Sequence, residues 1–178
     1  MKSSTFRLTG VCLTILLAGV SVHAEPPNLE TPAPVIYLAD NLDEPNQRGY
    51  CIDTIGRGFS ERLQTHSCKP EGGDVQYRFE AATGYIASPT YKNKCAALMG
   101  KAVPGVKLAL LDCADIPAQK FTYDEATQQL RPADRPDLCL VTAAESFRAG
   151  RYRKRELSLA DCTATDAVLR QWVVKNIE

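Results

Sequence analysis

The sequence predicts an all-β fold built from three copies of one small unit. The main evidence is that cysteines and aliphatic residues recur together at one spacing, while proline and glycine interrupt the chain every few residues. The first cysteine of each copy lies 44 residues after the previous one, and an aliphatic residue stands nine positions before it. These residues are Cys51, Cys95 and Cys139, preceded by Leu42, Ile86 and Leu130. A repeat of this length indicates one supersecondary unit that occurs several times.

A second cysteine ends a strand-like stretch in each copy. Cys68, Cys113 and Cys162 follow the first cysteines by 17, 18 and 23 residues. A leucine stands five positions before each of them, and a residue suited to a strand stands three positions before. This alternation predicts a half-buried strand. The aromatic residue near the end of each copy is expected to pack in the core. These aromatic residues are Phe79, Phe121 and Trp172.

The arrangement of the strands follows from the turns between them. The 11 prolines and 11 glycines leave few stretches long enough for a helix. Short strands with turns at close intervals favour a sandwich or a barrel. Three copies of about four strands each predict a closed threefold barrel with hairpin caps, the β-trefoil, because closure removes exposed strand edges. We expect this domain over residues 35–178, after a proline-rich, extended or disordered leader at residues 25–34.

The cysteines also indicate an exported protein. Six of the seven lie after residue 24, and an even number of cysteines in an exported chain implies disulfides. The number alone allows many pairings, but the repeat predicts one bond inside each copy. The predicted bonds are Cys51–Cys68, Cys95–Cys113 and Cys139–Cys162. No metal or cofactor is expected, because the cysteines form no C-x-x-C pairs and one histidine follows residue 24.

The N-terminus has the pattern of a secretory signal peptide over residues 1–24. Lys2 and Arg7 give a positive start, residues 11–20 form an apolar run, and the stretch ends at Ala24 with a suitable cleavage site. The apolar run is shorter than the roughly 20 residues that a membrane-spanning helix needs. We therefore expect a protein that is secreted or periplasmic, with no transmembrane anchor in the mature chain.

These features together resemble the ricin-B lectin family. Each copy in that family runs from an apolar strand to a cysteine followed by an aliphatic residue. A second cysteine follows at strand spacing, and the copy closes with glutamine, any residue and an aromatic residue. Gln119-Lys120-Phe121 matches the closing element, and the first and third copies match it less closely. The resemblance covers residues 35–176. It implies a β-trefoil that binds sugar.

The resemblance implies one sugar pocket of galactose type, in the first copy. Asp53, two positions after the first cysteine, stands where the family has its sugar-binding aspartate. Gln64 stands on the facing strand, and His66 takes the place of the aromatic residue that stacks on the sugar. A carboxylate accepts hydrogen bonds from two neighbouring hydroxyls, and an amide both donates and accepts. Further polar contacts in the family's pattern fall on Asp74 and Gln76.

The other two copies lack this polar set. The corresponding residues are Ala97, Ala109 and Leu111 in the second copy and Val141, Ser158 and Ala160 in the third. Each candidate in the first copy also has an ordinary structural alternative, since Asp53 suits a turn and Gln64 and His66 suit the surface of a strand. The favoured interpretation is one sugar site in the chain.

A second candidate surface lies in the third copy, which has the longest stretch between its cysteines. This stretch carries five basic residues, with Tyr152 among them. The basic residues are Arg148, Arg151, Arg153, Lys154 and Arg155. Such a cluster suits an anionic ligand such as a sulfated glycan, a lipopolysaccharide phosphate or an acidic partner, and the alternative is a solvated loop.

The sequence favours a secreted carbohydrate-binding lectin over other classes of protein. It contains no Gly-x-Ser-x-Gly, His-Glu-x-x-His or phosphate-binding glycine motif, so we do not expect an enzyme. The 21 basic and 21 acidic residues balance, and the predicted signal peptide removes two of the basic ones, so nucleic acid is not an expected partner. The alternative is a protein-binding β-trefoil with vestigial sugar sites, such as a cell-binding subunit of a multi-chain toxin.

Overall fold

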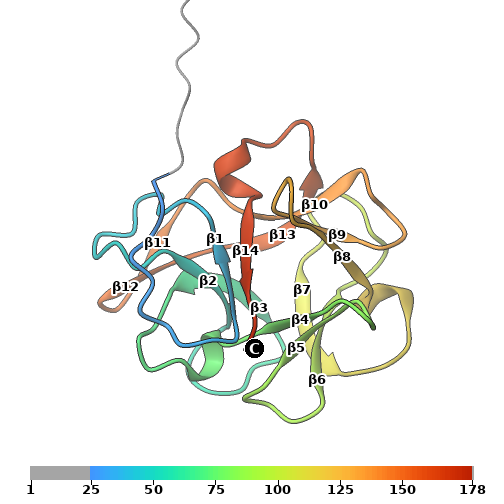
Figure 1. The fold of residues 1–178 in the computed structure, drawn as a ribbon, viewed down its shortest axis with the longest axis horizontal. Coiled ribbons are helices and arrows are strands. Elements are labelled where there is room, and N and C mark those ends of the chain that lie inside the picture. Colours follow the sequence, from blue (N-terminus) through green and yellow to red (C-terminus); the bar gives the residue numbers. More distant parts are fainter. Residues whose placement is uncertain (1–24, 178) are drawn as a thin grey trace, which may run out of the picture.

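The computed structural model describes residues 25–177, so the signal peptide predicted at residues 1–24 lies outside the described residues. The described part of the chain consists of short strands and three 3₁₀ turns around one core (Figure 1). The strands are β1 (Val35–Leu38), β2 (Tyr50–Thr54), β3 (Leu63–Ser67), β4 (Arg78–Glu80), β5 (Tyr85–Ser88), β6 (Lys94–Leu98), β7 (Leu108–Asp112), β8 (Phe121–Asp124), β9 (Gln129–Pro132), β10 (Leu138–Thr142), β11 (Phe147–Ala149), β12 (Tyr152–Arg155), β13 (Leu157–Asp161) and β14 (Trp172–Lys175). The 3₁₀ turns are η1 (Gly73–Val75), η2 (Pro117–Gln119) and η3 (Ala167–Leu169). Within residues 25–177, no helix is long and apolar enough to span a membrane.

The strands repeat in three copies and close into the predicted β-trefoil. Strands β2–β3, β6–β7 and β10–β13 pair antiparallel, one pair in each copy, and β11 and β12 are inserted between the strands of the third pair. Strands β4–β5 and β8–β9 pair between successive copies. Strand β1 pairs with β14, from Val35 opposite Lys175 to Leu38 opposite Trp172. This last pairing joins the first copy to the third and closes the barrel.

The three predicted disulfides are confirmed, and each lies inside one copy. The bonds are Cys51–Cys68, Cys95–Cys113 and Cys139–Cys162. In every copy the first cysteine lies in the first strand of the pair, and the second cysteine follows its partner strand. Each bond closes a loop of 17, 18 or 23 residues. In the chain-entropy account, a loop of this size stabilises the fold by about 3 kcal/mol.

The core aromatic residue of the first copy differs from the prediction. Phe121 and Trp172 are buried as expected, but Phe79 is only partly buried and packs at the edge of the core. Tyr77 is fully buried in its place. The 3₁₀ turns explain the shift, because η1 ends at Val75, two positions before Tyr77, and η2 ends two positions before Phe121.

The aliphatic repeat holds in two of the three copies. Ile86 in β5 and Leu130 in β9 are fully buried. Leu42 lies instead in the connection between β1 and β2, where it adopts φ 52°, and Leu38 of β1 fills the core. The first copy therefore has a longer connection between its first two strands. This connection carries Asp43, which takes part in the site described below.

Residues 25–34, predicted as a leader, form no strand and lie along the first copy. The Asn28 N–H donates to the Gln47 carbonyl at 2.5 Å, and the Thr31 hydroxyl donates to the Lys69 carbonyl at 2.8 Å. A Cβ atom at Gly49, which adopts φ 73°, would come within 2.6 Å of Pro27. Glycine at this position therefore permits the close approach of the segment to the barrel.

Candidate functional site

The extra length of the third copy forms a hairpin that joins the first copy. Strands β11 and β12 are linked by the two-residue turn of Gly150 and Arg151, where Gly150 adopts φ 65°. Strand β12 then pairs with β3 of the first copy, and Lys154 lies opposite His66. The predicted sugar pocket and the basic stretch therefore lie side by side, and Figure 1 shows β11 and β12 next to β2 and β3.

Strand β3 is buried along its whole length, contrary to the half-buried strand that its sequence predicted. The equivalent strands β7 and β13 keep exposed or partly exposed residues. The difference arises because β12 covers the outer edge of β3. Gln64 and His66 alternate with the core residue Leu63, so they lie on the other side of the strand, in an enclosed setting.

Four of the five residues predicted to bind sugar lie together. Asp53 in β2 lies opposite Gln64 in β3, and the Gln64 amide nitrogen is 3.5 Å from Asp53 Oδ2. The His66 Nδ1 atom lies 3.8 Å from the same oxygen. Asp74, in η1, is linked to Asp53 through the ammonium group of Lys69. The register of the β2–β3 hairpin thus brings the predicted polar set into one cluster.

The other two copies keep the strand pairing of this cluster without its polar groups. Where the first copy has Asp53 opposite Gln64, the second has Ala97 opposite Ala109 and the third has Val141 opposite Ser158. None of these four residues carries a carboxylate or an amide. The polar cluster is therefore particular to the first copy.

Lys69 is the member of the cluster that sequence reasoning missed. Its ammonium nitrogen lies 3.3 Å from Asp53 Oδ2 and 2.7 Å from Asp74 Oδ1. The Asp53 side chain is 0% exposed. The sequence feature that could have indicated Lys69 is its position directly after Cys68, just beyond the strand that carries Gln64. One lysine between two carboxylates can neutralise only one of them, so the cluster holds an excess of acid.

The pKa values in the cluster follow from burial and from this shared cation. Burial raises the pKa of Asp53 to about 7, against the opposing attraction of Lys69. Burial would lower the pKa of Lys69, but the Asp53 and Asp74 carboxylates outweigh it and raise the pKa. Burial also lowers the pKa of His66, so its ring is neutral at neutral pH.

Replacing Asp53 by asparagine is expected to remove a pH dependence of stability. Between about pH 4 and pH 7, folded Asp53 holds a proton that the unfolded chain has released, so the free energy of unfolding falls as the pH rises. We expect wild type to lose about 3 kcal/mol relative to Asp53→Asn across this window. Urea denaturation of both proteins at several pH values measures the difference. Parallel profiles would contradict the prediction.

Gln76 lies apart from the cluster. Its side-chain oxygen accepts a hydrogen bond from the Gly73 N–H at 2.9 Å. Its amide nitrogen donates to the carbonyls of Pro32 and Ala33, each at 3.3 Å. Gln76 thus holds the segment of residues 25–34 against the η1 turn. This position agrees with the shift that puts Tyr77, the next residue, in the core.

A pocket of about 610 Å³ opens between the first copy and the β11–β12 hairpin, and we call it the hairpin pocket. Its lining residues are Ile55, Gly56, Arg57, Gln64, His66 and Lys69 from the first copy and Ala149, Gly150, Arg151, Tyr152 and Lys154 from the hairpin. The Tyr152 ring packs edge-on against His66, with the ring centroids 5.2 Å apart. Asp53 lies beneath Gln64 and Lys69 and does not line the pocket. The wall therefore presents an amide, an imidazole, a tyrosine ring and several cations.

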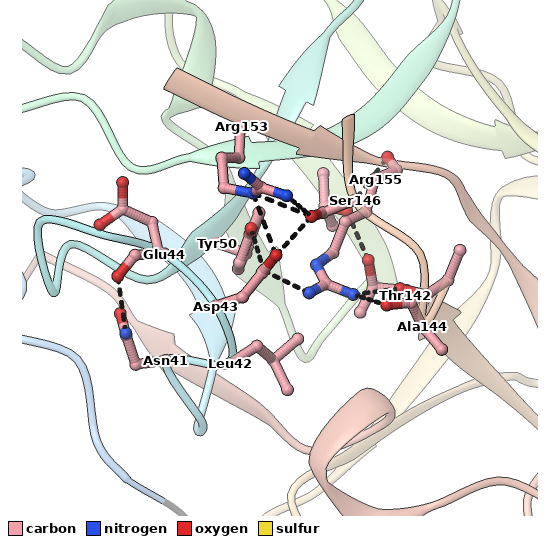
Figure 2. Close-up of polar contacts among 12 residues, drawn as sticks. Asn41, Leu42, Asp43, Glu44, Tyr50, Thr142, Ala144, Ser146, Arg153 and Arg155 are labelled. Carbon is pink, nitrogen blue, oxygen red and sulfur yellow. Dashed lines mark hydrogen bonds and ion pairs between the residues drawn. The ribbon is translucent and has the colours of Figure 1, made fainter. Parts of the chain in front are cut away.

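The hairpin is anchored to the first copy by Asp43 (Figure 2). The Asp43 carboxylate accepts a hydrogen bond from the Tyr50 hydroxyl at 2.6 Å and lies 3.0 Å from Arg153 Nε. Arg155 and Ser146 also donate to this carboxylate. Burial opposes ionisation, but hydrogen bonds from Ser146, Tyr50 and Arg155 hold the pKa of Asp43 well below its usual range. Asp43 thus links the pocket's outer wall to the first copy, in addition to the pairing of β12 with β3.

The five basic residues of the predicted anion-binding stretch therefore lie in different settings. Arg153 and Arg155 are paired with the Asp43 anchor. Arg151 and Lys154 line the hairpin pocket. The remaining residue is Arg148, which is exposed on β11 and does not line the pocket. Only part of the stretch faces a space that a ligand can enter.

Comparison with solved structures supports the fold. The solution structure of the mdaA-1 domain superposes with a TM-score of 0.58 at 18% identity, over 85% of this chain and 96% of that chain. The β-trefoil lectin of the Vibrio vulnificus hemolysin/cytolysin, with N-acetyl-D-lactosamine bound, superposes with a TM-score of 0.52 at 13% identity, over 81% of this chain and 95% of that chain. At these identities the likeness shows the β-trefoil fold.

A third solved structure matches over only part of its own length. The crystal structure of GalNAc-T7 with UDP, GalNAc and Mn²⁺ superposes with a TM-score of 0.52 at 15% identity over 72% of this chain. The match covers 20% of the GalNAc-T7 chain, so this protein spans about a fifth of that neighbour's length. No family model and no curated protein matches the sequence.

Proposed function

We propose that the protein is a carbohydrate-binding lectin with one site, the hairpin pocket. The observation that carries the proposal is that Gln64 and His66, two residues of the ricin-B pattern, line this pocket beside the Tyr152 ring. Ligand pockets commonly enclose about 300–1,000 Å³, and the hairpin pocket is of this size. An amide can meet sugar hydroxyls as donor and acceptor, and an aromatic ring can cover the apolar face of a sugar.

A sugar of galactose type is the ligand class that we propose. A neighbour of the same fold, the Vibrio vulnificus β-trefoil lectin, was solved with N-acetyl-D-lactosamine bound. The GalNAc-T7 structure, a fifth of which matches this chain, contains GalNAc. The first copy also keeps an aspartate and a glutamine, Asp53 and Gln64, at the positions of the family's galactose contacts. Because Asp53 is fully buried, its part in this proposal is to hold Gln64 and Lys69 in place, and these two side chains meet the sugar.

We also infer that the protein works outside the cytosol, either secreted or periplasmic. Its three disulfides support this inference, because such bonds form and persist in oxidising compartments.

Loss of the Gln64 amide tests the proposed function. We expect Gln64→Ala to weaken sugar binding about tenfold, because it removes one donor and one acceptor from the pocket. Ser158→Ala is the matched control, because Ser158 occupies the position of Gln64 in the third copy and lies outside the hairpin pocket. A glycan array followed by calorimetry with lactose measures both effects. A wild-type protein that binds no glycan would overturn the proposal and favour the protein-binding alternative.

A further inference from the structure

We propose that the glycan bound in the hairpin pocket is acidic and carries a sulfate or carboxylate group beside its galactose-type unit. This inference rests on the proposed function and specifies its ligand. It depends on three observations: the pocket is lined by basic residues, the Asp53 carboxylate is too buried to reach a ligand, and neighbouring arginines are instead paired with Asp43.

The pocket lining is basic and contains no acidic residue. Arg57, Lys69, Arg151 and Lys154 all contribute to it, and neither aspartate nor glutamate does. Three of these cations come from elements far apart in the chain, since Arg57 follows β2 whereas Arg151 and Lys154 belong to the hairpin. Cations that converge on one hollow from separate elements produce a local field that favours an anion.

Lys69 is held by Asp53 and Asp74, but among the described residues the other three cations of the lining are unpaired or weakly paired. Within residues 25–177, Arg57 and Lys154 form no ion pair, and Arg151 forms one, 3.6 Å from Glu71, in which both side chains are largely exposed. An exposed pair of this kind contributes little energy and is readily exchanged for another partner. By contrast, Arg153 and Arg155 are held by the Asp43 carboxylate. The hairpin therefore separates arginines that hold the structure from basic residues that face the pocket.

The group that would hold a neutral sugar is covered. A carboxylate recognises a neutral sugar by accepting hydrogen bonds from its hydroxyls, but the Asp53 side chain is 0% exposed and lies against Lys69. Lys69 also lines the pocket, but its ammonium group is already paired with Asp53 at 3.3 Å and with Asp74 at 2.7 Å. The basic groups left to meet the ligand are Arg57 and Lys154, which donate hydrogen bonds and accept none, so they suit an anionic oxygen. Charge-assisted bonds of this type are about twice as strong as neutral ones.

Calorimetry with four probes tests the inference, using 6-sulfogalactose, 3′-sialyllactose, lactose and inorganic sulfate. We expect wild type to bind at least one of the two acidic sugars about tenfold more tightly than lactose, and to lose this preference in roughly 0.5 M salt. The doubly substituted Arg151→Glu/Lys154→Glu protein should lose the preference for acidic sugars, measured as the ratio of its affinities for the acidic sugars and for lactose. Circular dichroism verifies that the variant is folded.

Arg148→Glu is the matched control, because Arg148 lies on the same hairpin but outside the pocket lining. We expect it to change the affinity for acidic sugars by less than about twofold. Equal binding of lactose and both acidic sugars would overturn this inference and leave the proposed function intact. Inorganic sulfate that binds as tightly as 6-sulfogalactose would instead overturn the proposed function, because the sugar would then contribute nothing. An Arg148→Glu effect as large as that of the double variant would also overturn the inference.

Discussion

Replacing Trp172 by alanine is expected to lower the free energy of unfolding by about 3–5 kcal/mol. Trp172 is fully buried, and it lies opposite Leu38 where β1 and β14 close the barrel. Its indole N–H donates to the Leu140 carbonyl at 2.8 Å. Alanine would leave a cavity at this closure and an unpaired carbonyl beneath it. Urea denaturation followed by circular dichroism measures the loss.

Phe147→Ala is a control for this substitution. It also removes an aromatic ring, but Phe147 is 50% exposed, so its loss should change the free energy of unfolding by no more than about 0.5 kcal/mol. A loss below about 1 kcal/mol in Trp172→Ala would show that the pairing of β1 with β14 does not depend on this side chain.

Asp43→Ala is expected to cost about 3 kcal/mol of stability and to weaken ligand binding as well. The Arg155 side chain is 4% exposed, and without Asp43 its buried charge would keep only backbone carbonyls and the face of the Tyr50 ring as partners. The Asp43 side chain is itself 45% exposed, so the expected cost lies at the low end for a broken buried pair. Because Asp43 also contacts Arg153, the whole β11–β12 hairpin should loosen.

Two measurements separate these effects. Urea denaturation gives the change in stability, and the rate of cleavage by trypsin at Arg148 and Arg151 reports opening of the hairpin. Asp137→Ala is the matched control, since it removes a carboxylate from Arg135 in a pair that is partly exposed on both sides. We expect that control to cost less than about 1 kcal/mol and to leave trypsin cleavage unchanged. Unaltered cleavage in Asp43→Ala would show that other contacts hold the hairpin.

Much of the fold could be predicted because a disulfide and a buried strand must recur at the same place in every copy. The first cysteines therefore lie in β2, β6 and β10, and each copy contains one disulfide bond. Equal spacing between the cysteines does not show where each strand begins within a copy. Leu42 lies in a longer connection in the first copy, and Tyr77 replaces Phe79 in the core. Side-chain burial depends on where a turn ends, which the spacing does not determine.

The site could be predicted only as far as one hairpin determines it. Asp53 and Gln64 face each other because they lie on paired strands of the same copy. The contact of β12 with β3 joins segments far apart in the chain, and one of its anchors is Asp43, a single acidic residue in an irregular connection. No pattern marks such a residue in a sequence. Asp53 is fully buried and paired with Lys69. Residue propensity and motif spacing do not reveal whether a given carboxylate is buried.

The hairpin of the third copy gives the molecule a site that belongs to no single copy. One wall comes from residues near the start of the described chain and the other from residues near its end, so the hollow is complete only when the two have met. A fragment that contains the first copy alone, even with its disulfide intact, would carry only one wall of the pocket. A bound ligand would in turn raise the free energy of unfolding of the whole barrel, because only the folded chain can bind it.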